Sequence, residues 1–239
     1  MRYLRMSGIG LLAAFAVAGV TAGAASAAEP VLVSKAAIGQ VAGPVAFTGT
    51  MPDPLLYLGA ESKLTCHTGS ISGEMTGPKA LADVVMILTH CESGGGEFET
   101  HGYPFEIVTN PMAGVLGALS PTEPGIKLFS EAGGRSGIVM EAEAFGGAVT
   151  LKVRGEITAA LSGHFAETAE TATFPSTLKL VFAVSKGIQK YRGFSEGLEA
   201  GLVGQWEQSI NGGAWEGFGV GQSVTLKSTP VAGDLAVTE

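Results

Sequence analysis

Apolar and polar side chains alternate one by one in the stretches that lie between clusters of glycine, proline and serine. Residues 177–185 read TLKLVFAVS, and every second side chain from Leu178 to Val184 is apolar. This period of two is typical of a β-strand with one face in the core and the other in water. The same pattern recurs at 104–109, 136–145, 148–158 and 222–228. The alternation therefore predicts a fold made of strands.

Turn signals separate these stretches, whereas helix signals are scarce. Clusters such as SGGG at 93–96 and EAGGRSG at 131–137 mark short connections. After the N-terminal segment, no stretch combines apolar residues at helical spacing with helix caps. About a dozen short strands with short turns indicate an all-β fold, either an antiparallel β-sandwich or a barrel. We predict one such domain over residues 28–228 and a flexible C-terminal tail at 229–239.

The N-terminal segment 1–27 has the order of features of a secretory signal peptide. Arg2 and Arg5 precede an apolar run at 8–20, and small residues occupy Ala25 and Ala27. This arrangement predicts cleavage after Ala27 and export of the remaining chain. The apolar run is shorter than the roughly 20 residues that cross a bilayer. We therefore expect a secreted, soluble protein without stable membrane insertion.

The charge balance narrows the class of partners. The chain has 14 lysines and arginines against 22 acidic residues, and the predicted signal peptide carries two of the arginines and no acid. The exported chain would then have 12 basic and 22 acidic residues, a net charge of −10. Because nucleic-acid binding depends on cationic contacts to phosphates, we expect no nucleic-acid partner. A glycan, the cell wall or another protein remains as a possible partner.

The only two cysteines occur in mirrored pairs, Cys66-His67 and His90-Cys91. A hairpin that turns at 77–80 places Cys66 opposite Cys91, within the distance that a disulfide accepts. An oxidising exterior favours that bond. Closing a loop of this size contributes about 3.5 kcal/mol in the chain-entropy estimate. We therefore predict a disulfide between Cys66 and Cys91.

The same register places His67 opposite His90, on the other face of the ribbon because successive strand residues alternate. Cysteines and histidines then cannot converge on one zinc ion. His67, His90 and Glu92 could still form a metal site of two histidines and one carboxylate. The alternative is a pair of histidines at the rim of an apolar face, as cross-strand pairs often are. We adopt this second interpretation and expect neither a metal nor a cofactor.

A serine motif and a tryptophan hairpin are the other candidate sites. Residues 193–197, GFSEG, fit the nucleophile-elbow pattern around Ser195 but lack the strand before it and the helix after it that the motif needs. We predict no catalytic residue. Asn211-Gly212 predicts a two-residue turn that sets Gln208 opposite Trp215 and places Trp206 and Trp215 on one face. The two indoles could bind a ligand such as a sugar, or they could fill the core.

A set of motifs resembles a group of exported actinobacterial proteins of unknown function. The shared features are Cys66, GEMTGPK at 73–79, Cys91 and EIVTNPMAGVLG at 106–117. The resemblance covers about residues 44–160, and this chain lacks the further cysteines that relatives carry after the second one. The resemblance implies export and β structure, and it brings no activity with it.

These observations predict an exported, non-catalytic binding or structural module at the cell envelope or in the medium. An alternative is a lipocalin-like carrier of a small apolar ligand. A third possibility is an exported hydrolase that uses Ser195 or a metal on His67 and His90.

Overall fold

The computed structural model describes residues 31–34, 39–40, 44–59, 62–120, 123–162, 165–166, 178–186, 188–191, 194, 206–228 and 235–238. Within these ranges the regular elements are all β-strands, so the predicted all-β fold is confirmed. The predicted signal peptide at 1–27 and Ser195 lie outside the described residues. In chain order the strands are β1 Val31–Ser34, β2 Gly39–Gln40, β3 Val45–Pro52, β4 Leu55–Leu58, β5 Ser62–Thr65, β6 Thr68–Met75, β7 Ala80–Thr89, β8 Cys91–Ser93, β9 Gly96–Phe98, β10 Glu106–Val108, β11 Met112–Ser120, β12 Glu123–Ser130, β13 Ile138–Ala144, β14 Val149–Ser162, β15 Phe165–Ala166, β16 Leu178–Phe182, β17 Val184–Ser185, β18 Ile188–Gln189, β19 Trp206–Ile210, β20 Glu216–Ser228 and β21 Leu235–Thr238.

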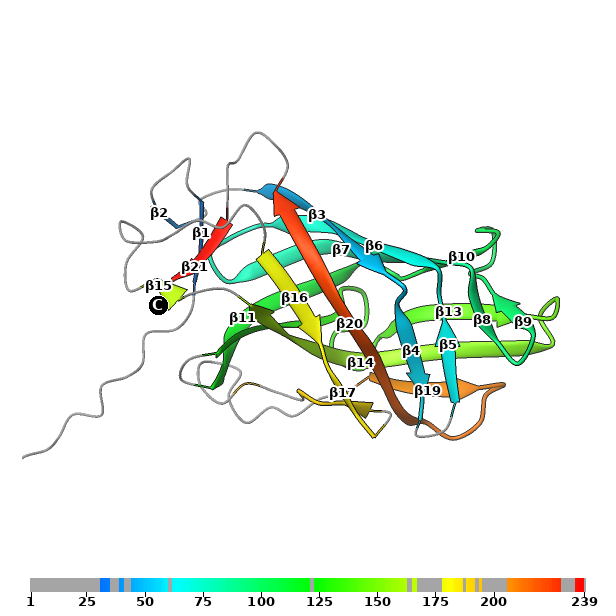
Figure 1. Cartoon of the computed structure of the whole chain (residues 1–239). Coiled ribbons are helices and arrows are strands. Elements are labelled where there is room, and N and C mark those ends of the chain that lie inside the picture. Colours follow the sequence, from blue (N-terminus) through cyan, green and yellow to red (C-terminus); the bar gives the residue numbers. More distant parts are fainter. Residues whose placement is uncertain are drawn as a thin grey trace, which may run out of the picture.

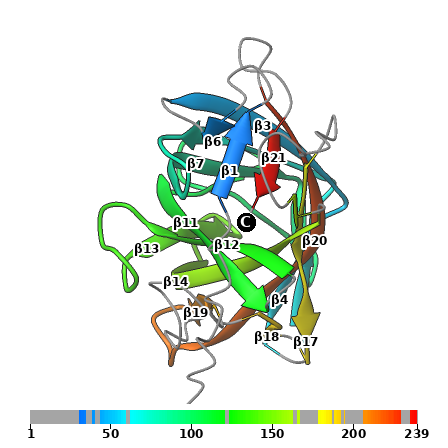
Figure 2. The same cartoon turned by 90° about the vertical axis from the view of Figure 1, so that its left-hand side faces the viewer.

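Eight of these strands pair side by side until the last one meets the first (Figure 1, left part). The order is β3, β6, β7, β11, β12, β14, β16, β20 and back to β3, and every pairing is antiparallel. Figure 2 shows strands of this ring arranged around a common centre. Because the hydrogen-bonded path closes on itself, this part of the sheet is a barrel rather than a sandwich.

A second ring adjoins the first and forms the right-hand part of Figure 1. It runs through β4, β5, β8, β9, β13, β14, β19 and β20. The step from β9 to β13 is a two-way backbone bridge, with Glu99 N 2.9 Å from Glu143 O and Glu143 N 2.7 Å from Glu99 O. The long strands β14 and β20 belong to both rings. We call residues 90–108 and 141–152 the distal end; they begin at the junction of the two rings and include the β8–β9 and β13–β14 turns at the outer limit of the second ring.

The interior of both rings is filled by apolar side chains. Buried residues on every main strand form one continuous cluster. Large members that are almost fully buried include Phe182, Phe218, Met51, Leu56, Ile71 and Met112. Such packing excludes water from the sheet interior and is the main source of stability for a fold of this kind.

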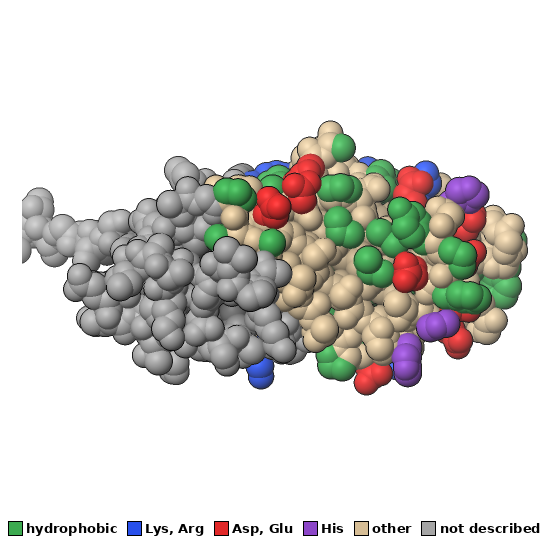
Figure 3. All heavy atoms as spheres, turned by 90° about the horizontal axis from the view of Figure 1, so that it is seen from above, with side chains coloured by type: hydrophobic (Ala, Val, Ile, Leu, Met, Phe, Trp, Pro, Cys, Tyr) green, Lys and Arg blue, Asp and Glu red, His purple; other side chains and the backbone are tan. Residues whose placement is uncertain are grey.

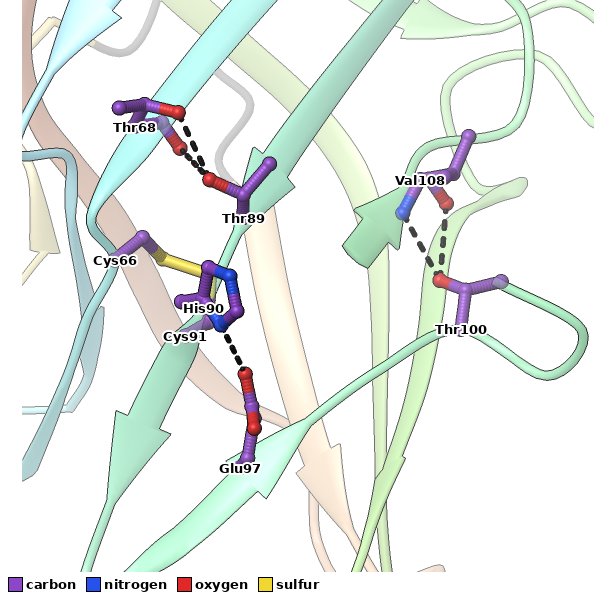
Figure 4. The surroundings of a disulfide bond; sticks show 8 residues. All are labelled: Cys66, Thr68, Thr89, His90, Cys91, Glu97, Thr100 and Val108. Atoms are coloured by element: carbon purple, nitrogen blue, oxygen red, sulfur yellow. Dashed lines mark hydrogen bonds and ion pairs between the residues drawn. A yellow bond between two sulfur atoms is a disulfide. The ribbon is translucent and has the colours of Figure 1, made fainter. Parts of the chain in front are cut away.

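The predicted pairing of Cys66 with Cys91 is confirmed. Thr68 faces Thr89 and Thr65 faces Glu92, so the cysteines lie between two cross-strand pairs of the same register. Their Cα atoms are 3.9 Å apart, and the two sulfurs form a disulfide (Figure 4). This bond joins the β6–β7 hairpin of the first ring to the β5 and β8 strands of the second.

The prediction that the cysteines lie on the face opposite the apolar residues is wrong. Cys66 and Cys91 are both buried, 1% and 0% exposed, and belong to the same core cluster as Ile71 and Leu88. Strict alternation would turn Cys66 away from Ile71, so the alternation shifts by one residue between them. On the partner strand the shift occurs at His90, whose φ of 47° is left-handed.

A row of such shifts crosses neighbouring strands at one level, and we call this row the seam. Its residues are Asp53, His67, His90 and Phe105. Backbone bonds run along it from Asp53 N to His67 O at 3.3 Å, from His67 N to Thr89 O at 2.9 Å and from His90 N to Phe105 O at 2.8 Å. Asp53 and Phe105 also have positive φ, 45° and 65°. The seam therefore redirects several strands together, at the junction of the two rings.

The C-terminal strand β21 lies within the stretch predicted to be a flexible tail. Residues 235–238 pair antiparallel with β1 and parallel with β15. The small sheet of β15, β21, β1 and β2 lies at the end of the molecule opposite the distal end (Figure 1).

Candidate functional site

Three aromatic side chains are exposed at the distal end. Tyr103 is 49% exposed, Phe105 54% and Phe145 58%, and together with Ile210 they are the large exposed hydrophobic residues in the described part of the chain. Figure 3 shows hydrophobic, acidic and histidine side chains gathered at this end of the molecule. Exposed aromatic rings concentrated in one place are typical of a contact surface.

Phe105 is held in place by the seam. Its backbone N–H donates to Glu99 Oε2 at 3.0 Å, and its carbonyl accepts the N–H of His90 at 2.8 Å. Its ring stacks on the His90 imidazole, with centroids 5.4 Å apart and the planes inclined by 28°. A bulky residue with φ of 65° is uncommon, and here backbone bonds on both sides hold it in that conformation.

Phe145 begins the turn between β13 and β14 and lies over the β8–β9 turn. A Cβ atom added at Gly96 would be 2.3 Å from the Phe145 ring. Only glycine leaves room for the ring at that position. Phe145 is thereby brought next to β9, while Glu143 pairs with Glu99 in the same region. The exposed rings thus come from connections that lie at the same end of the molecule.

A groove of about 550 Å³ lies on the same end. One side is the connection from β9 to β11, and the other is the outer face of the β13–β14 hairpin. Its lining is Thr100, His101, Val108, Asn110, Glu141, Ala142, Glu143, Thr150, Leu151 and Lys152. The Thr100 hydroxyl fixes the wall, because it donates to Glu141 O at 2.9 Å and accepts from Val108 N at 3.0 Å. Most of the lining side chains are polar, and Val108, Ala142 and Leu151 add apolar surface.

One ion pair and one histidine–carboxylate pair border this surface. Lys152 Nζ is 3.0 Å from Glu141 Oε1, and His101 Nδ1 is 3.4 Å from Glu143 Oε1. Residues 90–108 and 141–152 contain six glutamates against one lysine. With neutral histidines, the distal end therefore has a formal charge of −5, from six negative charges and one positive charge. These exposed pairs leave most of that negative charge uncompensated.

The metal site considered for His67, His90 and Glu92 does not form. His90 turns to Glu97 instead, with Nδ1 2.8 Å from Oε1 (Figure 4). Among the described residues no group of three histidine, cysteine or acidic side chains could hold a metal ion. The left-handed backbone at His90 redirects the imidazole, and strict strand alternation does not anticipate such a change.

The tryptophan hairpin has the predicted turn but not the predicted register. Gly213 N bonds to Ile210 O at 2.9 Å, and both central residues have positive φ, as a primed two-residue turn requires. Gln208 then pairs with Glu216 rather than with Trp215. The extra residue arises because residues 213–215 leave the ladder before β20 begins.

Trp215 is covered by a neighbouring cation. The guanidinium carbon of Arg154 is 4.0 Å from the centre of the Trp215 ring, and Arg154 also donates to Glu207 Oε2 at 3.0 and 3.2 Å. The indole is partly buried. The side chain of Trp206 is outside the described part of the structure. Trp215 therefore offers less open ring surface than the aromatics of the distal end.

Buried charge occurs at a separate place, on the outer face of β12 and β14. Lys127 is fully buried, with Nζ 3.4 Å from Glu156 Oε1 and 5.1 Å from the centre of the Phe194 ring. Arg135 also bonds Glu156. Removing one partner of such a pair leaves a buried charge uncompensated, which is strongly destabilising. In the β6–β7 turn, burial lowers the pKa of Lys79 below its ordinary value.

Sequence patterns did not identify the aromatic surface of the distal end. Tyr103 and Phe105 stand in THGYPFE, and Phe145 stands in AEAFGGA, both of which are rich in turn residues. An aromatic residue beside glycine or proline in a turn is a signal that could have found them, because a turn has less sheet surface to cover a ring.

The chain matches no family model, no curated protein and no solved structure. The resemblance to exported actinobacterial proteins therefore stays a prediction. Across the described residues, no helix has the length and apolar character needed to cross a membrane.

Proposed function

We propose that the protein is an exported, non-catalytic binding module and that its distal end is the binding surface. The observation that carries this proposal is the exposure of Tyr103, Phe105 and Phe145 at the same end of the molecule as an open groove. Rings that are about half exposed lose the remaining water contact when a partner covers them, which favours association. The backbone hydrogen bonds of the seam and the nearby disulfide hold the surface in one arrangement. Binding therefore requires little further ordering of the protein.

Two alternatives receive less support. A lipocalin-like carrier needs an enclosed apolar cavity, whereas large side chains such as Phe182, Phe218 and Met51 occupy the described interior. A hydrolase that uses a metal on His67 and His90 would need at least one further ligand beside them, and no group of three such side chains occurs among the described residues. Ser195, the other hydrolase candidate, lies outside the described residues.

The test is a ligand panel titrated into the purified protein and into the double variant Tyr103→Ala, Phe145→Ala. The panel contains a basic peptide, a neutral oligosaccharide and a long-chain fatty acid, and calorimetry measures the affinity. We expect one of the first two to bind, with an affinity at least about fivefold lower for the variant, since each of the two exposed rings contributes about 0.5–1.5 kcal/mol. Glu74→Gln, on the exposed face of β6 in the first ring, is the control.

Binding of the fatty acid alone, with equal affinity for both proteins, would support the carrier and contradict the proposal. Hydrolysis of a peptide, ester or glycoside by the purified protein would contradict the non-catalytic part.

A further inference from the structure

We infer that the distal end binds a cationic partner, namely an extended peptide segment rich in arginine or lysine. This inference rests on the proposed function and adds the chemical class of the partner. It draws on three independent features of the surface, which are its charge, its exposed rings and the spacing of its carboxylates.

The charge of the distal end selects a cation. Six glutamates against Lys152 give a formal charge of −5 on residues 90–108 and 141–152, which is half of the −10 of the chain without its first 27 residues. A surface with one dominant sign of charge attracts the opposite sign and repels its own. Acidic polymers are therefore excluded as partners, and a neutral ligand would gain nothing from these carboxylates.

The exposed rings offer contacts of their own to a cation. A guanidinium or ammonium group within about 6 Å of a ring centre is attracted by the negative face of the ring. The same protein uses this contact internally, since Arg154 lies 4.0 Å from the centre of Trp215 and Arg135 lies 5.4 Å from the centre of Phe129. At the distal end the backbone N–H of Phe105 bonds Glu99, and Phe145 follows Glu143 by two residues. Exposed rings and carboxylates of the same end can therefore both contribute to binding a cationic ligand.

The groove favours an extended chain. Glu141 and Glu143 are two residues apart on β13, so they project from the same face about 7 Å from each other. Their neighbours on β14 are Lys152 and Thr150. In an extended peptide, side chains two residues apart have the same spacing. A peptide with a basic residue at every second position can therefore bring one cation to each carboxylate, and Lys152 is the one cation that such a ligand would displace from Glu141.

The probe for this inference is an octapeptide of alternating arginine and glycine, titrated into the full exported chain by calorimetry. The control peptides replace arginine by serine or by glutamate. We expect the arginine peptide to bind and the two controls to show no measurable binding. Raising NaCl from about 50 to 500 mM should weaken binding at least about tenfold, because exposed charges are screened.

Matched variants locate the contact. Glu143→Gln and Phe145→Ala should each lower the affinity for the arginine peptide about two- to fivefold. The double variant should lower it about tenfold or more. Glu74→Gln removes one exposed carboxylate from the other ring and should leave the affinity within about twofold. Unfolding temperatures within a few degrees of the parent protein would establish that each variant is folded.

Three results would overturn the inference. The first is equal binding of the serine peptide, and the second is equal affinity of the arginine peptide for parent and double variant. The third is absence of arginine-peptide binding. If a neutral oligosaccharide then binds to the parent protein but not to the double variant Tyr103→Ala, Phe145→Ala, the inference of a cationic partner is wrong. In that case the proposed binding surface still stands.

Discussion

His90 is the residue on which the junction of the two rings depends. Its φ of 47° reverses the side-chain alternation, so that Cys91 enters the core while the imidazole reaches Glu97 at 2.8 Å. Histidine is one of the few residues other than glycine that adopt this conformation at modest cost, along with asparagine and aspartate. Asp53 and Asp83 serve the same purpose elsewhere, with φ of 45° and 51°.

A β-branched residue should therefore be poorly tolerated at His90 and well tolerated at His67. We expect His90→Val to lower the free energy of unfolding by about 1–3 kcal/mol, because valine is strained at positive φ. His67→Val, an exposed position without positive φ, should change it by less than about 0.5 kcal/mol. His90→Asn loses the same contact with Glu97 but keeps the backbone preference, so it should fall between the two.

Urea unfolding followed by fluorescence measures all three variants. Equal loss of stability in His90→Val and His67→Val would show that the left-handed backbone at His90 is not a structural requirement.

At the scale of elements, the sequence predicts strands and turns better than it predicts faces. The expected stretch 136–145 is β13, and 148–158 begins β14. The predicted pairing of Cys66 with Cys91 is confirmed, but it depends on a bulge: the register of Met75 with Leu81 next to the turn would place Cys66 opposite His90. The bulge at Asp83, where the pairing of β6 with β7 shifts, has no signal in the alternation. The extra residue that moves Trp215 away from Gln208 has no such signal either. Both irregularities depend on contacts with distant strands.

The disulfide stabilises the junction between the β6–β7 hairpin and the second ring. We expect Cys66→Ala, Cys91→Ala to lower the free energy of unfolding by about 3.5 kcal/mol, the chain-entropy value for a loop with a sequence separation of 25. Lost packing of the two buried sulfurs adds to this value.

Urea unfolding of the oxidised protein, the reduced protein and the double variant tests this expectation. Reduction of the disulfide should lower the stability of the parent protein to a value close to that of the double variant. Two free thiols in the purified, unreduced protein, found by mass spectrometry under non-reducing conditions, would contradict the crosslink itself.

At the scale of the whole molecule, alternation predicts the class of the fold but not its closure. A sandwich and a barrel have the same period of two, and only the pairing of β16 with both β14 and β20 decides between them. The candidate site likewise forms only because the second ring closes. Glu143 and Glu99 meet because β13 and β9 become neighbours, although they are 44 positions apart in the sequence. The tryptophans, which attract attention in the sequence, include one that Arg154 covers.

The central claim is that function resides on the distal end, outside the barrel interior. Amide chemical shifts in two-dimensional NMR spectra, recorded while the arginine–glycine octapeptide is added, test it most directly. We expect the largest changes at 90–108 and 141–152, with strands β3, β6 and β11 unchanged. Changes centred on the interior strands of the first ring, or spread evenly over the chain, would contradict the account.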